Sequence, residues 1–203
     1  MDELALIQAA QQGDVESFNV LVLRYQTRAY NLAFRLIGDR SGAADATQEA
    51  FIGAYNHLSQ YRGGNFSAWL MRIVTNACYD ELRRRKRRPA LSTEDLSEDA
   101  DESAISLASP DEDSPESVFD RRALSQAIQR CLDELPDAFR LVAVLGDVQG
   151  YDYREIAAIA RISLGTVKSR ISRARQRLRD CLQGIGELLP EVYRLNKQEN
   201  DGT

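Results

Sequence analysis

Side chains that could do covalent or metal chemistry are few in this sequence and lie far apart. It contains three cysteines, Cys78, Cys131 and Cys181, and one histidine, His57. Roughly fifty residues separate each cysteine from the next, which matches neither a disulfide framework nor a zinc site. An enzyme built on His57, or on Cys78 beside Asp80, is the weakest alternative, because no nucleophile, base and orienting group can be assembled. We predict no catalytic residue, no metal and no cofactor.

Cationic side chains, in contrast, are concentrated in two short stretches that could bind phosphate. Residues 83–88 are six consecutive basic residues, and residues 168–179 hold six basic residues and no acidic one. The simplest alternative for the first stretch is the placement of cations at a helix C-terminus. The alternative for the second is a solvated surface helix, although such helices usually mix both signs of charge. Both stretches favour contact with nucleic acid.

The acidic residues are concentrated in one block between these stretches. The 203 residues carry a net charge of −5, and residues 89–120 alone hold 11 acidic and no basic residues. This block is rich in Ser, Asp, Glu and Pro and lacks apolar periodicity, so it cannot bury enough surface to offset its chain entropy. We predict a flexible acidic linker. A solvating spacer is its simplest role, and mimicry of nucleic acid inside a basic channel is the alternative.

The segment before the linker has apolar residues at helical spacing. Asp14 can cap a helix that continues to Leu36, and a second helix starts near Asp45. A third starts near Phe66 and ends in the basic stretch before Pro89, which stops it. After the linker, two further helices carry apolar residues on either side of a Leu-Pro pair, and two shorter ones follow.

The last two helices are separated by a tight turn. Asp152 and Glu155 have the spacing of a capping box, residues 161–162 form the turn, and Ser163 can cap the second helix. A short helix, a tight turn and a second helix form the helix-turn-helix unit, whose second helix enters the major groove of DNA. Projected at roughly 100° per residue, that second helix has cations on both sides of an apolar stripe. The stripe consists of Val167, Ile171, Ala174 and Leu178.

These patterns contain no strand, and they predict an all-α chain. We expect two small helical domains, residues 1–88 and 121–182, joined by the linker at 89–120 and followed by a tail at 183–203. No run of about 18 apolar residues is present, and the acidic start is unlike a secretory signal. We therefore expect a cytoplasmic protein without membrane insertion.

Two polar surfaces of the first domain also favour binding. Aromatic residues lie near cations and amides between residues 61 and 76, which suits stacking on unpaired bases; for Trp69, packing in the core is an equal alternative. Asn76 can be a capping or buried amide, or it can read a base. Asp45, Gln48 and Glu49 share a helical face that suits docking onto a basic protein, with an ordinary exposed face as the alternative.

Several of these runs together resemble the extracytoplasmic-function (ECF) sigma factors of bacterial RNA polymerase, in the sigma-70 superfamily. The run 45–51 (DATQEAF) resembles the region-two segment that docks on the polymerase clamp. The run 66–73 (FSAWLMRI), with Asn76, Asp80 and residues 83–85, resembles the segment that melts and reads the −10 element. Leu135-Pro136, Asp147, the run 155–157 (EIA) and the run 165–175 resemble region four, which reads the −35 element.

The resemblance implies a set of site residues. Core-polymerase docking falls to Asp45, Gln48, Glu49, Phe51 and Tyr55. Contact with −10 DNA falls to Tyr61, Arg62, Asn65, Phe66, Trp69, Arg72, Asn76, Arg83, Arg84 and Arg85. Contact with −35 DNA falls to Ser163, Gly165, Thr166, Lys168, Ser169, Arg170, Arg173 and Arg177.

The resemblance also implies partners and a role. The partners are core RNA polymerase, through its clamp and flap, promoter DNA, and an anti-sigma factor that occludes both domains. The role is promoter-specific initiation in a stress or envelope response, with all catalysis left to the polymerase. Two promoter elements lie roughly two turns of duplex apart, and a flexible tether lets two domains reach both. A stand-alone helix-turn-helix regulator is the alternative, and it would bind free duplex without polymerase.

Overall fold

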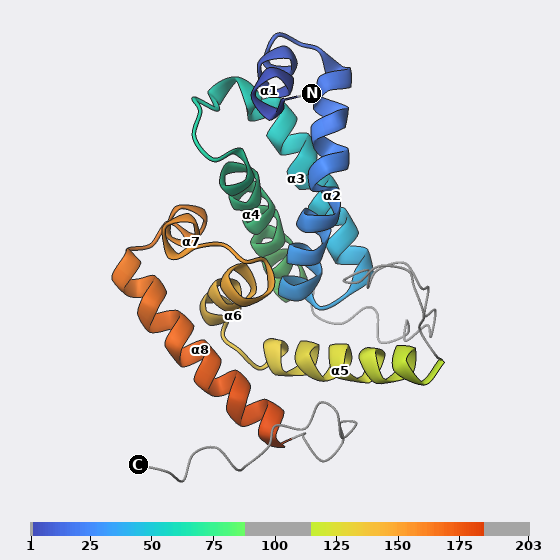
Figure 1. Ribbon diagram of the computed structural model, residues 1–203, viewed down its shortest axis with the longest axis vertical. Helices are drawn as coiled ribbons and strands as arrows, with labels where there is room; N and C mark the ends of the chain where they lie inside the picture. Colours follow the sequence, from blue (N-terminus) through green and yellow to red (C-terminus); the bar gives the residue numbers. More distant parts are fainter. Residues whose placement is uncertain (1, 88–114, 185–203) are drawn as a thin grey trace.

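The computed structural model of the chain describes residues 2–87 and 115–184, with side chains up to residue 87 and from residue 123 onward. Within these ranges every regular element is a helix, which confirms the predicted all-α class. The helices form two groups, one from each side of the predicted linker (Figure 1). Residues 89–114 of that linker, and residues 185–203 of the predicted tail, lie outside the described residues.

We call the two groups the first domain and the second domain. The first domain contains α1 (Glu3–Gln11), α2 (Val15–Ile37), α3 (Arg40–His57), the short 3-10 helix η1 (Leu58–Gln60) and α4 (Phe66–Arg87). The second domain contains α5 (Pro115–Asp133), α6 (Asp137–Ala143), the π-helical segment η3 (Val144–Val148), α7 (Tyr153–Ala160) and α8 (Leu164–Gly184).

Helix α2 starts and ends where the sequence supplies capping groups. The Asp14 carboxylate accepts hydrogen bonds from the backbone N–H of Glu16 at 3.1 Å and from the Ser17 hydroxyl at 2.6 Å, so the predicted cap is confirmed. At the other end, Gly38 has a φ of +91°, in the left-handed region that favours glycine. Its N–H donates to the Phe34 carbonyl at 2.8 Å and closes the helix.

The predicted start of α3 near Asp45 was wrong, because the helix starts at Arg40. Asp39 is its N-cap, and its carboxylate accepts a hydrogen bond from Gly42 N–H at 2.8 Å. The buried positions of the first turns are glycine and alanine, which give a weak apolar signal. Helix α1 was not predicted for a similar reason, since only Leu6, Ile7 and Ala10 of its nine residues are buried.

The second domain starts earlier than the charge pattern indicated. Helix α5 begins at Pro115, inside the segment 89–120 that was predicted as linker. Proline is tolerated in the first turn of a helix, where its missing N–H would have no intrahelical partner. The boundary predicted at 121 therefore moves to 115.

One contiguous apolar core includes buried residues of both domains. In the first domain, the large side chains that are almost completely buried are Leu6, Leu21, Leu32, Leu36, Leu58, Leu70, Met71 and Val74. In the second domain they are Leu132, Leu145, Ile156 and Ile171. Burial of one leucine or isoleucine side chain stabilises the fold by roughly 1.5–3 kcal/mol relative to leaving it exposed. These residues therefore hold in place the helices whose outer faces carry the polar and charged side chains of each domain.

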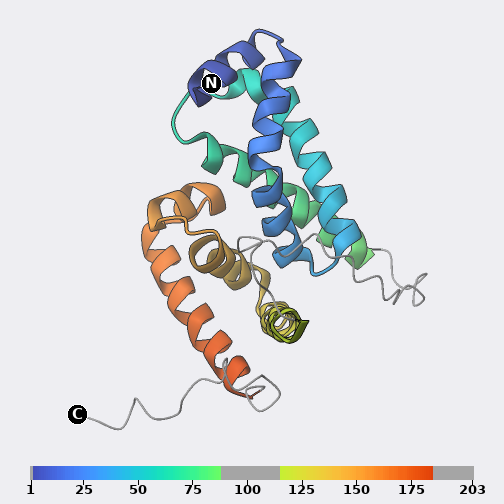
Figure 2. The same cartoon turned by 45° about the vertical axis from the view of Figure 1, so that its right-hand side comes forward.

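The two domains are in contact along one side of α4 and the end of α2. Helix α7 lies beside the start of α4, and α5 lies beside the end of α2, in both views (Figures 1 and 2). Helix α8 lies on the side of the second domain that faces away from α1–α3 (Figure 2). The second domain therefore covers part of the first domain, while the outer side of its own last helix, α8, is exposed to solvent.

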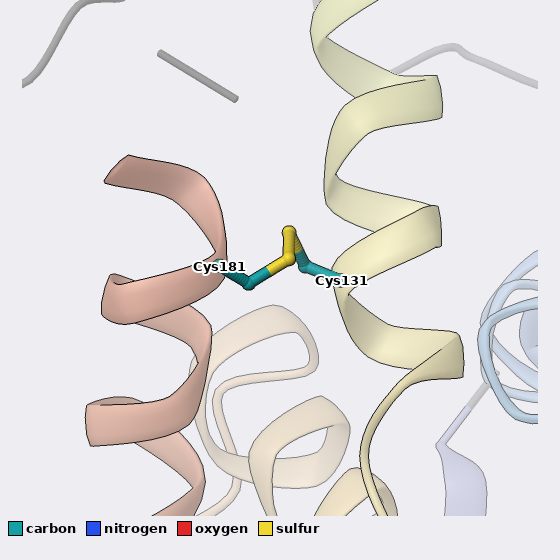
Figure 3. Close-up of a disulfide and its surroundings, with 2 residues drawn as sticks. All are labelled: Cys131 and Cys181. Atoms are coloured by element: carbon teal, nitrogen blue, oxygen red, sulfur yellow. A yellow bond between two sulfur atoms is a disulfide. The ribbon is translucent and has the colours of Figure 1, made fainter. Parts of the chain in front are cut away.

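A disulfide between Cys131 and Cys181 joins α5 to α8 (Figure 3). The prediction that the cysteine spacing does not suit a disulfide framework was wrong for this pair: the fold brings residues 50 apart in sequence to a Cα–Cα distance of 5.7 Å. Distance along the chain does not report distance across a helical domain. The remaining thiol, Cys78, is buried, and burial raises its pKa to about 12, so it is not a thiolate nucleophile near neutral pH.

Candidate nucleic-acid interface

The helix-turn-helix is built as the sequence predicted. Asp152 caps α7: its carboxylate accepts hydrogen bonds from the N–H groups of Arg154 at 2.7 Å and Glu155 at 2.8 Å. The Glu155 carboxylate accepts in return from Asp152 N–H at 2.8 Å, which completes the capping box. Arg161 ends α7 with a φ of +54°, and the Ser163 hydroxyl accepts from Thr166 N–H at 3.1 Å at the start of α8.

Helix α8 buries the predicted stripe and exposes its cations. Val167, Ile171 and Ala174 are buried and Leu178 is half-buried, so the stripe forms the contact with the rest of the domain. Lys168 and Arg173 are exposed, and no ion pair joins either to another described residue. An exposed helix face with uncompensated positive charge attracts the phosphates of a DNA groove.

The remaining predicted −35 residues lie on or near this face. Gly165 and Ser169 are exposed in the first turns, where helix-turn-helix proteins meet base edges. Arg177 lies over the ring of Phe139 at 5.3 Å. Arg170 is half-buried and close enough to Tyr79 to influence the pKa of that phenol, so it faces the first domain. The structure thus brings the predicted set together on one helix, with Arg170 at its edge.

The predicted stacking aromatics form a cluster inside the first domain. Tyr61 and Phe66 are 8% and 2% exposed, and their ring centroids are 5.4 Å apart in an edge-on arrangement. Trp69 is half-buried, 5.4 Å from each of them. The Tyr61 hydroxyl donates to the Gly64 carbonyl at 2.7 Å. Core packing therefore describes Tyr61 and Phe66 in this arrangement, and their contact with bases stays a prediction.

The polar residues predicted near the −10 element lie around the start of α4 and along it. Arg62 and Asn76 are exposed and Arg72 is half-buried. The Asn65 side-chain oxygen Oδ1 accepts from Ala68 N–H at 2.9 Å and so caps α4. Its amide nitrogen donates to the Glu155 carboxylate at 2.6 Å, across the boundary between the domains.

The three arginines at the end of α4 are paired with acids of the same domain. Arg83 pairs with Asp80 of its own helix. Arg84 pairs with Glu81 and, at 3.2 Å, with Glu49 on α3. These pairs neutralise much of the charge of the three arginines, and their predicted contact with nucleic acid stays a prediction.

Arg85 completes this network. It pairs with Asp39 and with Glu81, the latter at 2.6 Å. A Cβ atom on Gly42 would lie 1.9 Å from the Arg85 guanidinium, so a larger residue at position 42 would displace that group. The hydrogen bond to Asp39 raises the pKa of Arg85. Burial alone would raise the pKa of Asp39, but the hydrogen bonds from Arg85 and Gly42 lower it below its usual value.

The predicted docking residues share the outer face of α3. Asp45, Gln48, Glu49 and Tyr55 are exposed, whereas Phe51 is half-buried and packs on the core. The sequence analysis missed Ile52, which is 56% exposed among them. Its type and spacing could have identified it, since an apolar residue one turn after Gln48 lies on the same side of a helix.

Other kinds of site find little support in the described residues. Among residues 2–87 and 115–184, no three His, Cys, Asp or Glu side chains are grouped so that they could hold a metal ion. No helix in the described part of the chain is long and apolar enough to cross a membrane. His57 is exposed, with its ring nitrogen Nδ1 3.1 Å from the Gln60 amide.

An all-α chain with an exposed cationic helix on a helix-turn-helix belongs to the broad class of DNA-binding proteins. Two family models match it: sigma-70 region 2 over residues 21–88 and sigma-70 region 4 over residues 125–178. Two solved structures are similar to it, each 26% identical. CnrH in complex with the cytosolic domain of CnrY has a TM-score of 0.64, over 89% of this chain and 96% of that one. The sigma factor RpoE in complex with the anti-sigma factor NepR, from Bartonella quintana, has a TM-score of 0.61, over 82% and 97%.

Proteins with similar sequences are also sigma factors of bacterial RNA polymerase. The ECF RNA polymerase sigma factor SigE of Mycolicibacterium smegmatis is 42% identical over 172 residues, which are 84% of this chain and 63% of SigE. The RNA polymerase sigma-H factor of Pseudomonas aeruginosa is 36% identical over 89% of this chain and 93% of its own. The ECF sigma-E factor of Escherichia coli K12 is 36% identical over 91% and 96%.

The chain therefore belongs to the extracytoplasmic-function sigma factors of the sigma-70 family. It is an alternative sigma factor, which directs promoter-specific transcription. The first domain contains the region-two match and the second domain contains the region-four match.

Proposed function

We propose that the second domain reads the −35 element by placing α8 in the major groove. The observation that carries this proposal is the exposed cationic face of α8, on which Lys168 and Arg173 have no ion-pair partner among the described residues. Ser163, Gly165, Thr166 and Ser169 occupy the first turns of the helix or its cap, where side chains meet base edges. Arg170 and Arg177 flank this surface and would contact the phosphate backbone of the DNA.

The first domain, in the same proposal, docks on core RNA polymerase through the outer face of α3. Asp45, Gln48 and Glu49 supply polar and acidic groups, and Tyr55 and Ile52 supply exposed apolar area. Phe51 supports the face from below, because it is half-buried against the core. An apolar centre with a polar rim is the usual composition of a protein interface.

Contact with −10 DNA falls to the start of α4 and to its exposed side. Arg62, Asn65, Arg72 and Asn76 provide cations and amides there. Arg83, Arg84 and Arg85 would bind DNA phosphates in exchange for the acids of the first domain with which they pair. Tyr61, Phe66 and Trp69 stand behind these groups as a packed aromatic cluster. Strand separation on this surface would need an unpaired base to reach Trp69, the most exposed member of the cluster.

The proposal extends to partners and location. The Bartonella relative is bound to an anti-sigma factor, and we propose that an anti-sigma factor also holds this chain until a stress or envelope signal releases it. The clamp and flap of the polymerase are the proposed docking sites for the two domains, and the chain acts in the cytoplasm. The polymerase performs all the chemistry, and this chain contributes binding and positioning alone.

A transcription assay tests this function. Purified bacterial core polymerase is combined with the protein on a promoter library, and specific start sites are mapped. We expect new starts that share spaced −35 and −10 elements. The double variant Lys168→Ala/Arg173→Ala should lose most of these starts, whereas Arg130→Ala, which removes an exposed cation from α5, should keep them. Tight binding to free duplex without polymerase-dependent starts would instead support a stand-alone helix-turn-helix regulator.

A further inference from the structure

Helix α1 carries none of the residues proposed to bind polymerase or DNA, although it touches the segment that leads into α4. The match to sigma-70 region 2 begins at residue 21, after α1. In both views α1 lies beside the end of α3, where the chain turns toward α4 (Figures 1 and 2). Leu6, Ile7 and Ala10 of α1 are buried. The Tyr25 hydroxyl of α2 donates to the Glu3 carboxylate at 2.6 Å, so α1 is attached at its start as well.

One side chain of α1, that of Gln11, binds the backbone around η1. Its amide nitrogen Nε2 donates to the Leu58 carbonyl and to the Tyr61 carbonyl, each at 2.9 Å. A side-chain amide nitrogen has two hydrogens to donate, and both are used here. Leu58 is the first residue of η1 and Tyr61 follows its last. Gln11 therefore ties both ends of η1 to α1.

The loop that follows η1, residues 61–65, is held at its start and stands clear of the domain at its tip. The Tyr61 hydroxyl donates to the Gly64 carbonyl at 2.7 Å and closes the loop on itself. Gly63 and Gly64 have φ values of +98° and +96°, in the left-handed region that favours glycine. Beyond the adjoining residues, a Cβ atom on either glycine would have no neighbour within 4 Å. The position of the tip therefore depends on Tyr61.

Tyr61 also connects Gln11 to groups that are proposed to meet −10 DNA. Its ring lies 5.4 Å from the ring of Trp69, and the exposed Arg62 follows it directly in the chain. A shift of the Tyr61 backbone would move its ring and the start of the loop together, and with them the packing of Trp69. Binding groups must be held within about 0.5 Å of the productive geometry by the residues behind them. Gln11 is placed to do this for the loop.

We propose that Gln11 is a positioning residue for −10 recognition: its two hydrogen bonds hold the loop 61–65 and Trp69 in the arrangement that an unpaired strand binds. This inference rests on the proposed −10 function of the start of α4. A loop that is already in place does not have to be ordered when the strand binds. Where only a fraction of the molecules has the loop in place, the apparent affinity falls in proportion to that fraction.

The test compares the full chain with three variants. Gln11→Ala removes both hydrogen bonds, and Gln11→Glu keeps the length of the side chain but replaces its donor by an oxygen that would face two carbonyl oxygens. Gln12→Ala is the matched control, because Gln12 is exposed and its side chain makes no hydrogen bond to another described residue.

Three measurements separate the loop from the rest of the domain. Fluorescence anisotropy gives the affinity for a labelled single strand that carries the −10 element found in the transcription assay, or for a random-sequence pool if none is found. Titration with core polymerase gives the affinity of the docking face on α3. Acrylamide quenching of Trp69, the single tryptophan, reports on the aromatic cluster in the free protein.

We expect Gln11→Ala and Gln11→Glu to bind the strand about 10-fold more weakly, because the two hydrogen bonds that hold the loop are lost. Trp69 should be quenched more readily in both variants, since its packing against Tyr61 loosens. The affinity for core polymerase should stay at the wild-type value, because the α3 face is untouched. Gln12→Ala should match the wild type in all three measurements.

Other outcomes would overturn the role of Gln11. Unchanged strand affinity in Gln11→Ala would show that the loop needs no support from α1. An equal loss of polymerase binding would show that Gln11 stabilises the whole domain and not the loop. Weaker strand binding with unchanged Trp69 quenching would exclude an effect that passes through Tyr61. If the wild type neither binds the strand nor supports transcription, the proposed function itself fails and the role of Gln11 falls with it.

Discussion

The disulfide offers a direct test of what holds the second domain together. The perturbation is Cys181→Ser, which removes the bond between α5 and α8 at the partly exposed member of the pair. Cys131 is 1% exposed, and a serine there would bury a hydroxyl group and add a separate cost. Changing Cys181 therefore isolates the contribution of the covalent link.

The expected magnitude follows from the size of the loop. The bond joins residues 50 apart in sequence, and closing a loop of that length lowers the entropy of the unfolded chain by an amount worth about 4 kcal/mol at 25 °C. Measured values are often smaller than this chain-entropy limit, so we expect a loss of about 2–4 kcal/mol in the free energy of unfolding of the second domain.

The assay is urea unfolding followed by far-ultraviolet circular dichroism, with tryptophan fluorescence recorded on the same samples. The single tryptophan, Trp69, lies in the first domain, so its fluorescence reports on that domain and circular dichroism reports on both. Cys181→Ser should lower the urea midpoint of the second domain. A strong reductant should lower the wild type to the same midpoint and leave the variant unchanged.

Two results would refute this reasoning. Equal midpoints for oxidised wild type and Cys181→Ser would show that the bond contributes no net stability. A difference that persists in reductant would show that the serine, and not the missing bond, destabilises the domain. Agreement with the expectation would also show that the stability of the second domain depends on redox conditions, since a reductant opens the bond.

Three further predictions concern a cap, a carboxylate and two cations. Asp152→Ala removes the cap of α7 and should cost about 1 kcal/mol in urea unfolding; an unchanged midpoint would argue against the capping box. The lowered pKa of Asp39 stabilises the fold above the unfolded pKa of about 3.9, and this contribution should disappear as pH falls through the folded pKa. Stability measured against pH should therefore fall less steeply for Asp39→Asn. Lys168→Ala and Arg173→Ala should each reduce the salt dependence of promoter binding by about one unit of slope, and an unchanged slope would place both side chains away from phosphate.

The helix-turn-helix could be predicted closely from the sequence because its signals are local. The capping box needs two residues three apart, and the apolar stripe of α8 needs only the helical repeat, so neither depends on distant parts of the chain. The same holds for Asp14 at the start of α2. These predictions were confirmed.

The features that the sequence analysis missed depend on contacts between distant residues. Cys131 and Cys181 meet only because α5 and α8 pack together. Arg84 and Glu49 come from different helices, so their ion pair could not be predicted from the basic stretch alone. The start of α3 was missed for another reason, because small buried residues such as Gly42 carry little apolar signal although the Arg85 side chain needs the space they leave.

The link between α5 and α8 also has a mechanical consequence. Residues 131–181 form a covalently closed loop that contains every residue proposed to read the −35 element. A pull applied to the two ends of the chain passes through the sulfur–sulfur bond and leaves the enclosed helices without load. Fully extended, 50 residues span roughly 165–180 Å. A stretching force cannot extend this part of the chain until a reductant breaks the disulfide. The recognition helix is therefore protected against tension as long as both cysteines stay oxidised.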